Sequence, residues 1–578
     1  MTHRNYLTVL FLLIGLTVQA QSRHLISANP TSAPSSGIEV QQTQAPFSGT
    51  LPARMPQEEG DFNTEGTSFW VTFMKNYEYN ADSKYLKMQL VFSSRYAASI
   101  AVTNPNTGWS TSATVKANGV TIITVPTAQC YNYESDQTRN TGLYIEATAP
   151  ISVYASNFAD YTFDATNVIP AASLGTDYIV QAYQTPREGS TEFAVVATED
   201  NTTVTMVLAC PTLNRKKGTY SVRLNKGQVY QATTEADKGS LSGSVIKADK
   251  PVAVFNGDID LYIPDGKGYS DHIVEQAAPV QTWGKKFVLT KSQGQTADYV
   301  QFTAMSDGTR IMRNGTTLAT INTCESYMYR LTDAATYIET SAPCACYLYQ
   351  SSRTSNSSHI GDPSMIWITP QEQGIKQITF ATFKTQVIRY HYMNVVVPTS
   401  AVGSMTCNGT ALTGFKTVPG NSDYSYLTKR IDHGTYTLFN DQAEFTAHVY
   451  GMGVDESYAY CVGGYLRKIN EADIDEIIEQ VTIEQTFDIC EGQSVTINGK
   501  PYSENTTFTE QVGDQLKKYT VVVHSSFVNE ETREFRQGTS FKWHGKTIST
   551  PGIYKDEHTS VYGCDSVYKL IAKYETSF

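Results

Sequence analysis

Positive charge is scarce in this sequence, and long apolar runs are confined to its first residues. The 44 Lys and Arg against 56 Asp and Glu give a formal net charge of −12. Recognition of phosphates needs a basic stripe, so this balance argues against a nucleic-acid partner and against docking on anionic lipid. After residue 20 no stretch is apolar enough to cross a bilayer, so we expect no membrane span.

Catalytic signatures are also missing. The sequence has no Gly-x-Ser-x-Gly elbow and no His-Glu-x-x-His motif, and its ten His are too dispersed to form a zinc site. Asp271 and His272 are adjacent, but neighbours on a strand point to opposite faces and would not converge on one substrate. We therefore expect no enzyme and no cofactor. A glycosidase with two facing carboxylates stays open, because a strand-rich sequence hides spatial pairs.

The first twenty residues form a targeting segment. Arg4 supplies a positive start, residues 7–18 are apolar, and Ala20 ends a small-residue cleavage site. This pattern predicts a signal peptide over 1–20, and hence a protein that is secreted or held at the outer cell surface, with the periplasm as an alternative. Residues 21–60 are rich in Ser, Thr, Gln and Pro, and we expect a disordered lead-in.

What the sequence does contain is a repeated order of strands and turns. The clearest copy spans residues 300–370: an alternating run, a turn at Asp307-Gly308, a second run, a turn at Asn314-Gly315, a third run, an extended segment broken by Pro343, and a closing apolar strand. Asn-Gly between alternating runs is the strongest short-range hairpin signal. The copies are predicted over residues 66–174, 175–283, 284–373 and 374–466.

These copies predict an all-β fold. Each has the size of a complete small β domain of about 100 residues, and helical periodicity is nearly absent from residues 61–466. We expect four tandem β-sandwich-like modules. Because no Pro/Ser-rich linker separates the copies, they should pack on one another, and the sequence leaves a linear array and a closed ring equally open.

A second, smaller repeat follows an acidic connector. Residues 467–480 carry Ile474, Ile477 and Ile478 at helix-like spacing. Residues 481–578 repeat the interval from a Gly to a Gly-Lys pair, once at 492–500 and once at 538–546, which predicts two small β modules. The nine cysteines are an odd count, and export permits disulfides. Cys490 and Cys564 are the favoured pair; the alternative is that they are small buried apolar residues.

Two features are candidate binding sites. The acidic segment with Asp258, Asp260, Asp265 and Asp271 offers the oxygen ligands that calcium prefers, although its spacing departs from an EF-hand and a solvated acidic loop is the alternative. Tyrosines spaced two apart should share one sheet face, and they would form a platform for sugar or protein if exposed, or core if buried. The candidates are Tyr77, Tyr79, Tyr131, Tyr133, Tyr390 and Tyr392.

The order of these motifs resembles a known family. Residues 65–466 resemble the N-terminal domain of the IgGFc-binding protein family, and the resemblance is carried by residues 66–73, 197–204, 249–254, 271–276, 283–284 and 362–366. The last 90 residues are similar to short cysteine-bearing repeats of bacterial surface proteins, particularly in Bacteroidetes, which begin Ile-Cys-Glu-Gly and end Gly-Cys-Asp-Ser.

The first resemblance implies a secreted or cell-surface binding protein, or adhesin, that recognises an extracellular host protein such as immunoglobulin Fc or a mucosal glycoprotein. The alternative is a carbohydrate-binding surface protein that uses exposed Tyr or Trp platforms. A third class is an extracellular structural component.

Overall fold

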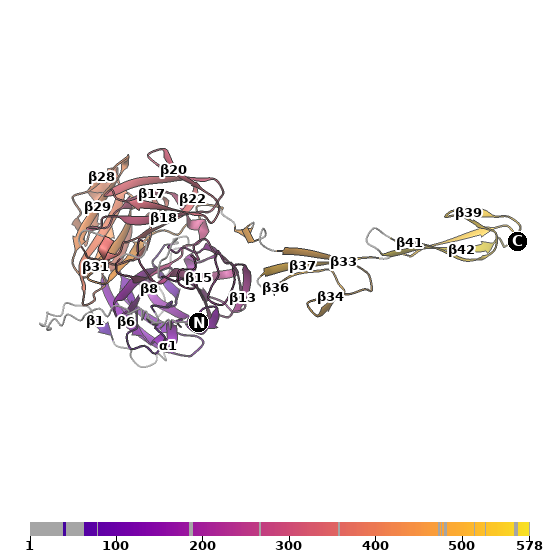
Figure 1. Cartoon of the computed structure of the whole chain (residues 1–578), viewed down its shortest axis with the longest axis horizontal. Helices are drawn as coiled ribbons and strands as arrows, with labels where there is room; N and C mark the ends of the chain where they lie inside the picture. Colours follow the sequence, from indigo (N-terminus) through magenta and orange to yellow (C-terminus); the bar gives the residue numbers. More distant parts are fainter. Residues whose placement is uncertain are drawn as a thin grey trace, which may run out of the picture. The chain divides into compact units, whose positions relative to one another are not determined.

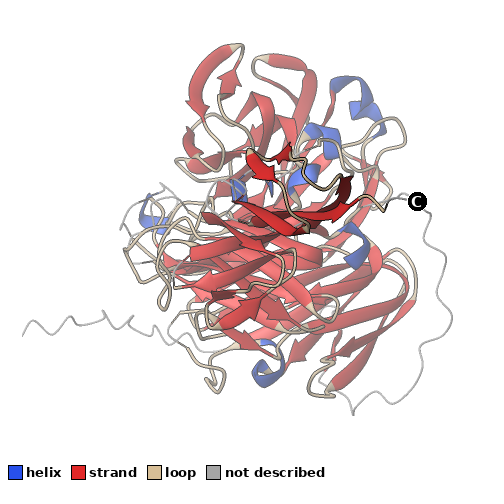
Figure 2. Ribbon diagram, turned by 90° about the vertical axis from the view of Figure 1, so that its right-hand side faces the viewer, coloured by secondary structure: helices blue, strands red, loops and turns tan. Residues whose placement is uncertain are grey.

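The computed structural model describes residues 39–41, 63–77, 79–183, 189–264, 268–355, 359–471, 474–475, 477–478, 483–513, 515–525, 528–559 and 564–576. The predicted signal peptide lies outside these residues, as does all of the lead-in except 39–41. Strands account for most of the described chain and helices are short (Figure 2), which confirms the all-β prediction. Within the described residues, no helix is long and apolar enough to cross a membrane.

The first sheet belongs to residues 39–168 and has the order β1-β6-β3-β8-β4-β5, with β2 and β9 also paired to β8. The helix α1 (Thr127–Cys130) and the strand β7 (Gln137–Arg139) precede β8. The strands of this sheet are β1 (Glu39–Gln41), β2 (Gly66–Val71), β3 (Lys87–Ser94), β4 (Ala98–Thr103), β5 (Ser110–Val115), β6 (Gly119–Val125), β8 (Leu143–Ala159) and β9 (Thr162–Val168).

The second and third sheets repeat this plan. The second has the order β13-β12-β15-β11-β14-β7, and the third has the order β20-β19-β22-β18-β21. Their strands are β10 (Gly175–Ile179), β11 (Thr191–Ala197), β12 (Thr202–Val207), β13 (Thr219–Leu224), β14 (Val229–Thr233), β15 (Val245–Leu261) and β16 (Asp271–Gln276), then β17 (Gly284–Thr290), β18 (Asp298–Ala304), β19 (Thr309–Arg313), β20 (Thr316–Ile321), β21 (Ser326–Leu331), β22 (Ala335–Tyr349) and β23 (Met365–Trp367).

Residues 377–463 form two sheets instead of one, with the orders β24-β30-β26-β27 and β28-β29-β25-β31-β32. Short 3-10 helices η1 (Ala171–Ser173), η2 (Val280–Thr282), η3 (Arg353–Ser355), η4 (Gln371–Gln373) and η5 (Thr399–Ser404) connect strands. The strands are β24 (Gln377–Ala381), β25 (Ile388–Pro398), β26 (Thr406–Cys407), β27 (Thr410–Ala411), β28 (Lys416–Val418), β29 (Asn421–Ile431), β30 (Thr435–Phe439), β31 (Thr446–Gly453) and β32 (Ser457–Gly463).

One long strand organises each of the first three sheets, and a proline interrupts its pairing. The first half of β8 pairs with β2 and β4, and its second half pairs with β3 and β9. Proline has no N–H for a ladder and is confined to edges and bulges. The register with the opening strand accordingly shifts around Pro150, Pro251 and Pro343. The extended segment expected to be broken by proline is therefore a single strand with a bulge.

A glycine that opens each of these sheets contacts the proline that follows its closing strand. A Cβ on Gly66 would lie 2.6 Å from Cβ of Pro170, and the corresponding distance is 2.7 Å for Gly175 and Pro279. For Gly284 and Pro370 it is 2.5 Å. A side chain at these positions would overlap the proline ring, so the repeated Gly in the sequence reflects a close approach.

The strands that end each copy, here called the closing strands, are β9, β16, β23 and β32. They contact one another in a closed cycle: β9 with β16, β16 with β23, β23 with β32, and β32 with β9. The ends of this region also meet, because the Thr64 N–H donates to the carbonyl of Gly464 at 3.1 Å. The first and fourth copies therefore touch, as a ring requires (Figure 1).

A single carboxylate joins the four closing strands. Both oxygens of Asp164, on β9, are fully buried and accept backbone N–H groups. One oxygen accepts from Ala165 at 2.9 Å and from Ala459 of β32 at 3.1 Å. The other accepts from Val274 of β16 at 3.2 Å and from Met365 of β23 at 3.1 Å. Burial raises the pKa of Asp164 well above its ordinary value, and these N–H donors lower it in part.

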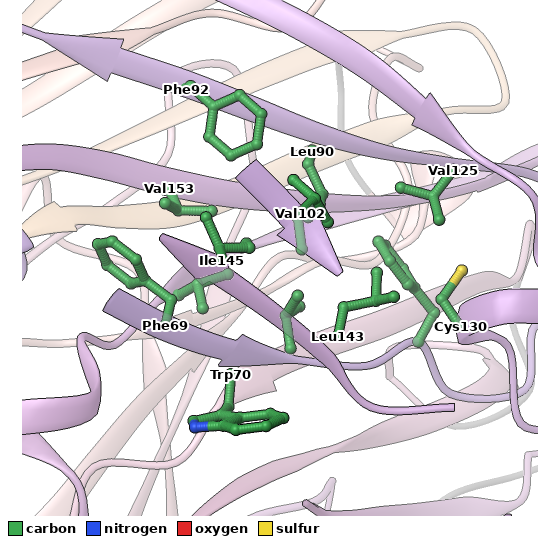
Figure 3. Close-up of a cluster of buried hydrophobic side chains, with 14 of the residues drawn as sticks. Phe69, Trp70, Leu90, Phe92, Val102, Val125, Cys130, Leu143, Ile145 and Val153 are labelled. Carbon is green, nitrogen blue, oxygen red and sulfur yellow. The ribbon is translucent and has the colours of Figure 1, made fainter. Parts of the chain in front are cut away.

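Apolar cores lie within the sheets and also between them. Phe69, Leu90, Phe92, Ile145 and Val153 pack together in the first copy (Figure 3). A second core joins Tyr154 and Phe163 of the first copy to Phe380, Tyr458 and Tyr460 of the fourth, and the rings of Tyr154 and Tyr460 are 4.5 Å apart. The copies therefore share buried surface, and the connector contributes Ile474 to a further core.

The C-terminal residues form two units with one topology. In the first, β33 (Ile483–Cys490) pairs in parallel with β37 (Gln515–His524), which pairs antiparallel with β36 (Thr506–Val512), and β34 (Val495–Ile497) pairs with β35 (Lys500–Tyr502). The second repeats this with β38 (Val528–Phe535), β42 (Asp565–Tyr574), β41 (Gly552–Thr559), β39 (Phe541–Trp543) and β40 (Lys546–Ile548). A disulfide joins Cys490 to Cys564, the pair favoured from the sequence; all nine cysteines are described, and the other seven are free.

Replacement of Asp164 by Asn should strongly destabilise the region that holds the four closing strands. All four hydrogen-bond partners of Asp164 are N–H donors. The side-chain amide of Asn has only one oxygen to accept them, so its NH₂ group would face the two donors on the other side. We expect the free energy of unfolding to fall by about 2–5 kcal/mol, measured by urea denaturation. Asp200→Asn is the matched control. Asp200 is exposed and accepts a single N–H, from Lys226, which the side-chain oxygen of Asn can still accept. Equal stability of both variants would contradict the role assigned to Asp164.

Candidate functional site

The four closing strands begin at one end of the cycle, here called the hairpin face. It consists of the connections 160–161, 262–270, 350–364 and 454–456 together with the loop 72–86, as far as these residues are described. Neighbouring connections bond to one another: Ser352 and Ile263 exchange hydrogen bonds of 2.7 and 3.0 Å. The Gly361 N–H donates to the carbonyl of Gly453 at 2.8 Å, and Arg353 forms an ion pair with Asp455.

Four tyrosines gather at this face and form the tyrosine cluster. Tyr77, Tyr79 and Tyr85 belong to the loop 72–86, and Tyr161 lies in the β8–β9 turn. The ring centroids of Tyr77 and Tyr79 are 5.5 Å apart, and those of Tyr79 and Tyr85 are 5.7 Å apart. Burial, Asp160 and the three other tyrosines all raise the pKa of Tyr79. Tyr77, Tyr85 and Tyr161 are about equally exposed, at 41%, 41% and 40%.

Buried polar side chains hold the loop that carries the cluster. The hydroxyl of Tyr131 accepts the N–H of Asn76 at 2.9 Å and donates to the carbonyl of Tyr79 at 3.0 Å. The side chain of Asn76 in turn bonds Asn157 at 3.1 Å and Thr162 at 2.6 Å. Asn76 and Tyr131 are almost fully buried, so the exposed rings stand on a fixed base.

Two members of the cluster have unusual backbone conformations. Tyr77 has a φ of 49° and Tyr161 has a φ of 75°. A bulky non-glycine residue rarely adopts positive φ, and each such residue costs of order 1–3 kcal/mol. Strain of this kind persists where surrounding structure enforces it, and it concentrates at binding sites. Two strained, exposed tyrosines in one cluster mark this surface as the best candidate for recognition.

Buried acids lie beneath the hairpin face. Asp271 has zero exposure, and one of its oxygens accepts the N–H of Phe163 at 2.7 Å and of His272 at 2.9 Å. Burial raises the pKa of Asp271 well above its ordinary value, and the nearby carboxyl of Asp362 raises it further. His272 is also fully buried, and burial lowers its pKa to about 3. A substrate therefore cannot reach the Asp271–His272 pair in this conformation.

The predicted calcium residues do not form one surface loop. Asp258 and Asp260 belong to the strand β15, and Asp271 opens β16; Asp265 lies outside the described residues. One oxygen of Asp258 accepts the N–H groups of Ser190 and Asp260 at 3.0 and 3.1 Å. Among the described residues, no group of three or more His, Cys, Asp or Glu is arranged to hold a metal ion. Calcium therefore stays a prediction without structural support.

The six candidate tyrosines separate into different environments. Tyr77 and Tyr79 are in the cluster, but they lie in a loop and not on a strand. Tyr131 is 1% exposed and supports that loop, and Tyr133 lies under Arg139, whose guanidinium is 4.4 Å from the ring. Tyr390 is half-buried beneath Arg430, and Tyr392 stacks on buried Tyr450.

The sequence pattern missed Tyr85 and Tyr161. Neither has a tyrosine two residues away, and the spacing rule that selected the other candidates therefore passed over them. The only local signal was the position of Tyr161 in the short turn Asp160-Tyr161 between two strands.

The geometry defines an all-β protein whose closing strands form one buried cycle with a loop surface at one end. A family model described as IgGFc binding protein matches residues 164–451. The human IgGFc-binding protein (Homo sapiens) is 27% identical over 258 residues, which are 44% of this chain and 5% of the human protein. The chain thus spans a small fraction of that relative's length.

This chain belongs to the IgGFc-binding protein family through residues 164–451, and the family resemblance is confirmed. The matched segment begins at Asp164 itself and includes β16, β23 and the second, third and most of the fourth copy. It is shorter than the expected 65–466, so residues 66–73 and all four tyrosines of the cluster lie outside it.

The buried acids and histidines predict a stability maximum at mildly acidic pH. Burial raises the pKa of Asp258 to about 8 and of Glu456 to about 7. A raised pKa contributes stability that is fully present below the unfolded value and is lost as pH rises through the folded value. Burial lowers the pKa of His391 and His448 to about 4, and their contribution is lost as pH falls from about 6.5 to about 4.

Asp258→Asn should reduce the loss of stability between pH 6 and pH 9. The amide oxygen still accepts the two N–H groups and carries no charge to bury. We expect the melting temperature at high pH to rise by several degrees relative to the parent chain, measured by thermal unfolding across that range. Asp249→Asn is the control, because Asp249 lies exposed on the same strand and accepts one N–H from Thr203. If melting temperature falls with pH equally in Asp258→Asn and in the parent chain, the raised pKa assigned to Asp258 is wrong.

Proposed function

We propose that this protein is an exported binding protein, without enzymatic activity, that recognises an extracellular protein or glycoprotein through its hairpin face. The observation that carries the proposal is the tyrosine cluster, in which two exposed rings are held in strained backbone conformations on a buried polar base. Tyr supplies a large contact area with few rotatable bonds, and it is enriched among residues that dominate binding energy. Export rests on the sequence of residues 1–20.

The geometry of the cluster favours a protein surface over a flat sugar ring. The planes of Tyr77 and Tyr79 are inclined by 54°, and those of Tyr79 and Tyr85 by 37°. Rings inclined in this way form a contoured surface and not one plane. Lys84, whose ammonium lies 5.0 Å from the ring of Tyr85, and exposed Asp160 add charges of both signs. Mixed aromatic and charged contacts are typical of protein interfaces.

The name of the human relative supports immunoglobulin Fc as the first ligand to test. The relative's name refers to that protein, and only a small part of it corresponds to this chain. A mucosal glycoprotein is the second ligand, and glycan recognition is the alternative function. An extracellular structural role, which needs no ligand at the cluster, is the third.

Immobilised Fc, purified mucin and deglycosylated mucin should separate these functions in a pull-down with residues 21–578. Binding to Fc, or to mucin with and without its glycans, supports protein recognition. Binding that is lost on deglycosylation would replace it by the glycan function, and absence of binding to all three would place the structural role first.

Tyr77→Asn and Tyr161→Asn should each weaken binding by about tenfold or more if the cluster is the contact surface. Asn adopts positive φ more readily than other non-glycine residues, so the backbone should be kept. Tyr96→Asn is the matched control: Tyr96 is 38% exposed and lies in the β3–β4 turn, away from the hairpin face. Equal binding by all three variants would show that the ligand binds elsewhere.

A further inference from the structure

A hollow of 540 Å³ lies on the fourth copy, where β25 ends and β29 begins. Its lining residues are Pro398, Thr399, Ser400, Ser422, Asp423 and Tyr424. It is distinct from the hairpin face. Ile388 pairs with Gly453 beside the connection 454–456, whereas Pro398 lies ten residues further along β25, roughly 30 Å away at about 3.3 Å per residue.

The walls of this hollow are fixed by hydrogen bonds. The hydroxyl of Thr399 donates to the carbonyl of Ser422 at 2.7 Å and bonds the hydroxyl of Ser425 at 3.0 Å. The N–H of Asp423 donates to the side-chain oxygen of Asn421 at 3.0 Å. These bonds tie η5 to the start of β29 and hold the turn that presents Asp423, whose side chain is exposed.

An aromatic pair forms one side of the hollow. The rings of Tyr424 and Tyr337 are stacked, with centroids 6.1 Å apart and planes inclined by 15°. Tyr337 belongs to β22 of the third copy and is 9% exposed. It packs into a small core with Val288, Val396 and Tyr426, and Tyr424 packs against that core while it lines the hollow.

Negative charge surrounds this pair. Burial raises the pKa of Tyr337, and the carboxylates of Glu339, Glu372 and Asp423 raise it further. Burial also raises the pKa of Tyr424, and the carboxylates of Glu372 and Asp423 raise it further. Glu372 accepts the backbone N–H groups of Lys285 and Lys286 at 3.1 and 3.3 Å. Within the described part of the chain, none of these three carboxylates forms an ion pair with Lys or Arg.

An open hollow is complementary to a cation when it has an aromatic wall and, in its lining, a carboxylate such as Asp423 that forms no ion pair among the described residues. The face of a tyrosine ring attracts a guanidinium or ammonium group, and Arg is the cation that most often binds in this way. We propose that this hollow is a second contact site, which takes an arginine side chain of a protein partner, with Tyr424 and Asp423 both in its lining. It goes beyond the proposed function and does not depend on the tyrosine cluster.

The proposal is tested with the chain 21–578 and two short peptides, acetyl-Gly-Arg-Gly-amide and its citrulline analogue, observed by saturation-transfer difference NMR. Citrulline has nearly the shape of arginine and no charge. We expect saturation of the arginine side-chain protons, little for citrulline, and a loss of the arginine signal as ionic strength rises to about 0.15 M. Equal signals from both peptides, or none from either, would overturn the proposal.

Variants assign the signal to the hollow. Asp423→Asn should weaken arginine binding about three- to fivefold, as expected for one partly exposed charge contact, and Tyr424→Phe should retain binding because the ring is kept. Asp441→Asn, an exposed aspartate of the same copy, is the control for non-specific attraction to an acidic protein. If Asp423→Asn and Asp441→Asn bind equally, the arginine does not occupy this hollow. Methyl β-galactoside is observed in the same way as a sugar probe. A signal from this sugar with no signal from the arginine peptide would instead identify the hollow as a sugar site.

Discussion

The carboxylate of Asp164 is the interaction on which the rest of the β region depends. Its two oxygens accept N–H groups from β9, β16, β23 and β32, so one side chain bonds to four strands from four parts of the chain. A buried backbone N–H without an acceptor is costly. Because the acceptor is shared, displacement of any one closing strand leaves a donor unpaired and disturbs the other three.

This constraint acts on the middle of the cycle and not on its two ends. The closing strands are buried on both faces, and their positions are set by Asp164 and by the cores between copies. Connections at either end carry no such requirement. The tyrosine cluster occupies one end, and the acidic hollow lies toward the other end of β25. A rigid centre allows strained or charged surface residues to be kept at the ends, because their local cost in free energy is small against the stability of the buried cycle.

Local signals in the sequence predicted local structure well. Asn314-Gly315 joins β19 and β20 with φ of 50° and 78°, the conformation that this dipeptide favours in tight hairpins. The order of strands around Pro343 was also correct, although the proline bends a continuous strand and does not end it. Local signals do not account for the closing strand β9. Thr162-Phe-Asp-Ala-Thr alternates polar and apolar residues as a half-exposed strand would, yet every residue of β9 is buried.

The burial of the polar residues of β9 has one physical cause. Alternation predicts a solvent-facing side only if the polar residues have no other partner, and in β9 their partners come from strands that are about 110–300 residues distant in the sequence. The same reasoning applies to Asp258 and Asp271, which belong to strands and bond to backbone N–H groups. An acidic residue in a β-rich sequence is therefore ambiguous between a ligand site and a strand clamp. Only the long-range pairing distinguishes them, and in this protein it makes Asp164 a strand clamp.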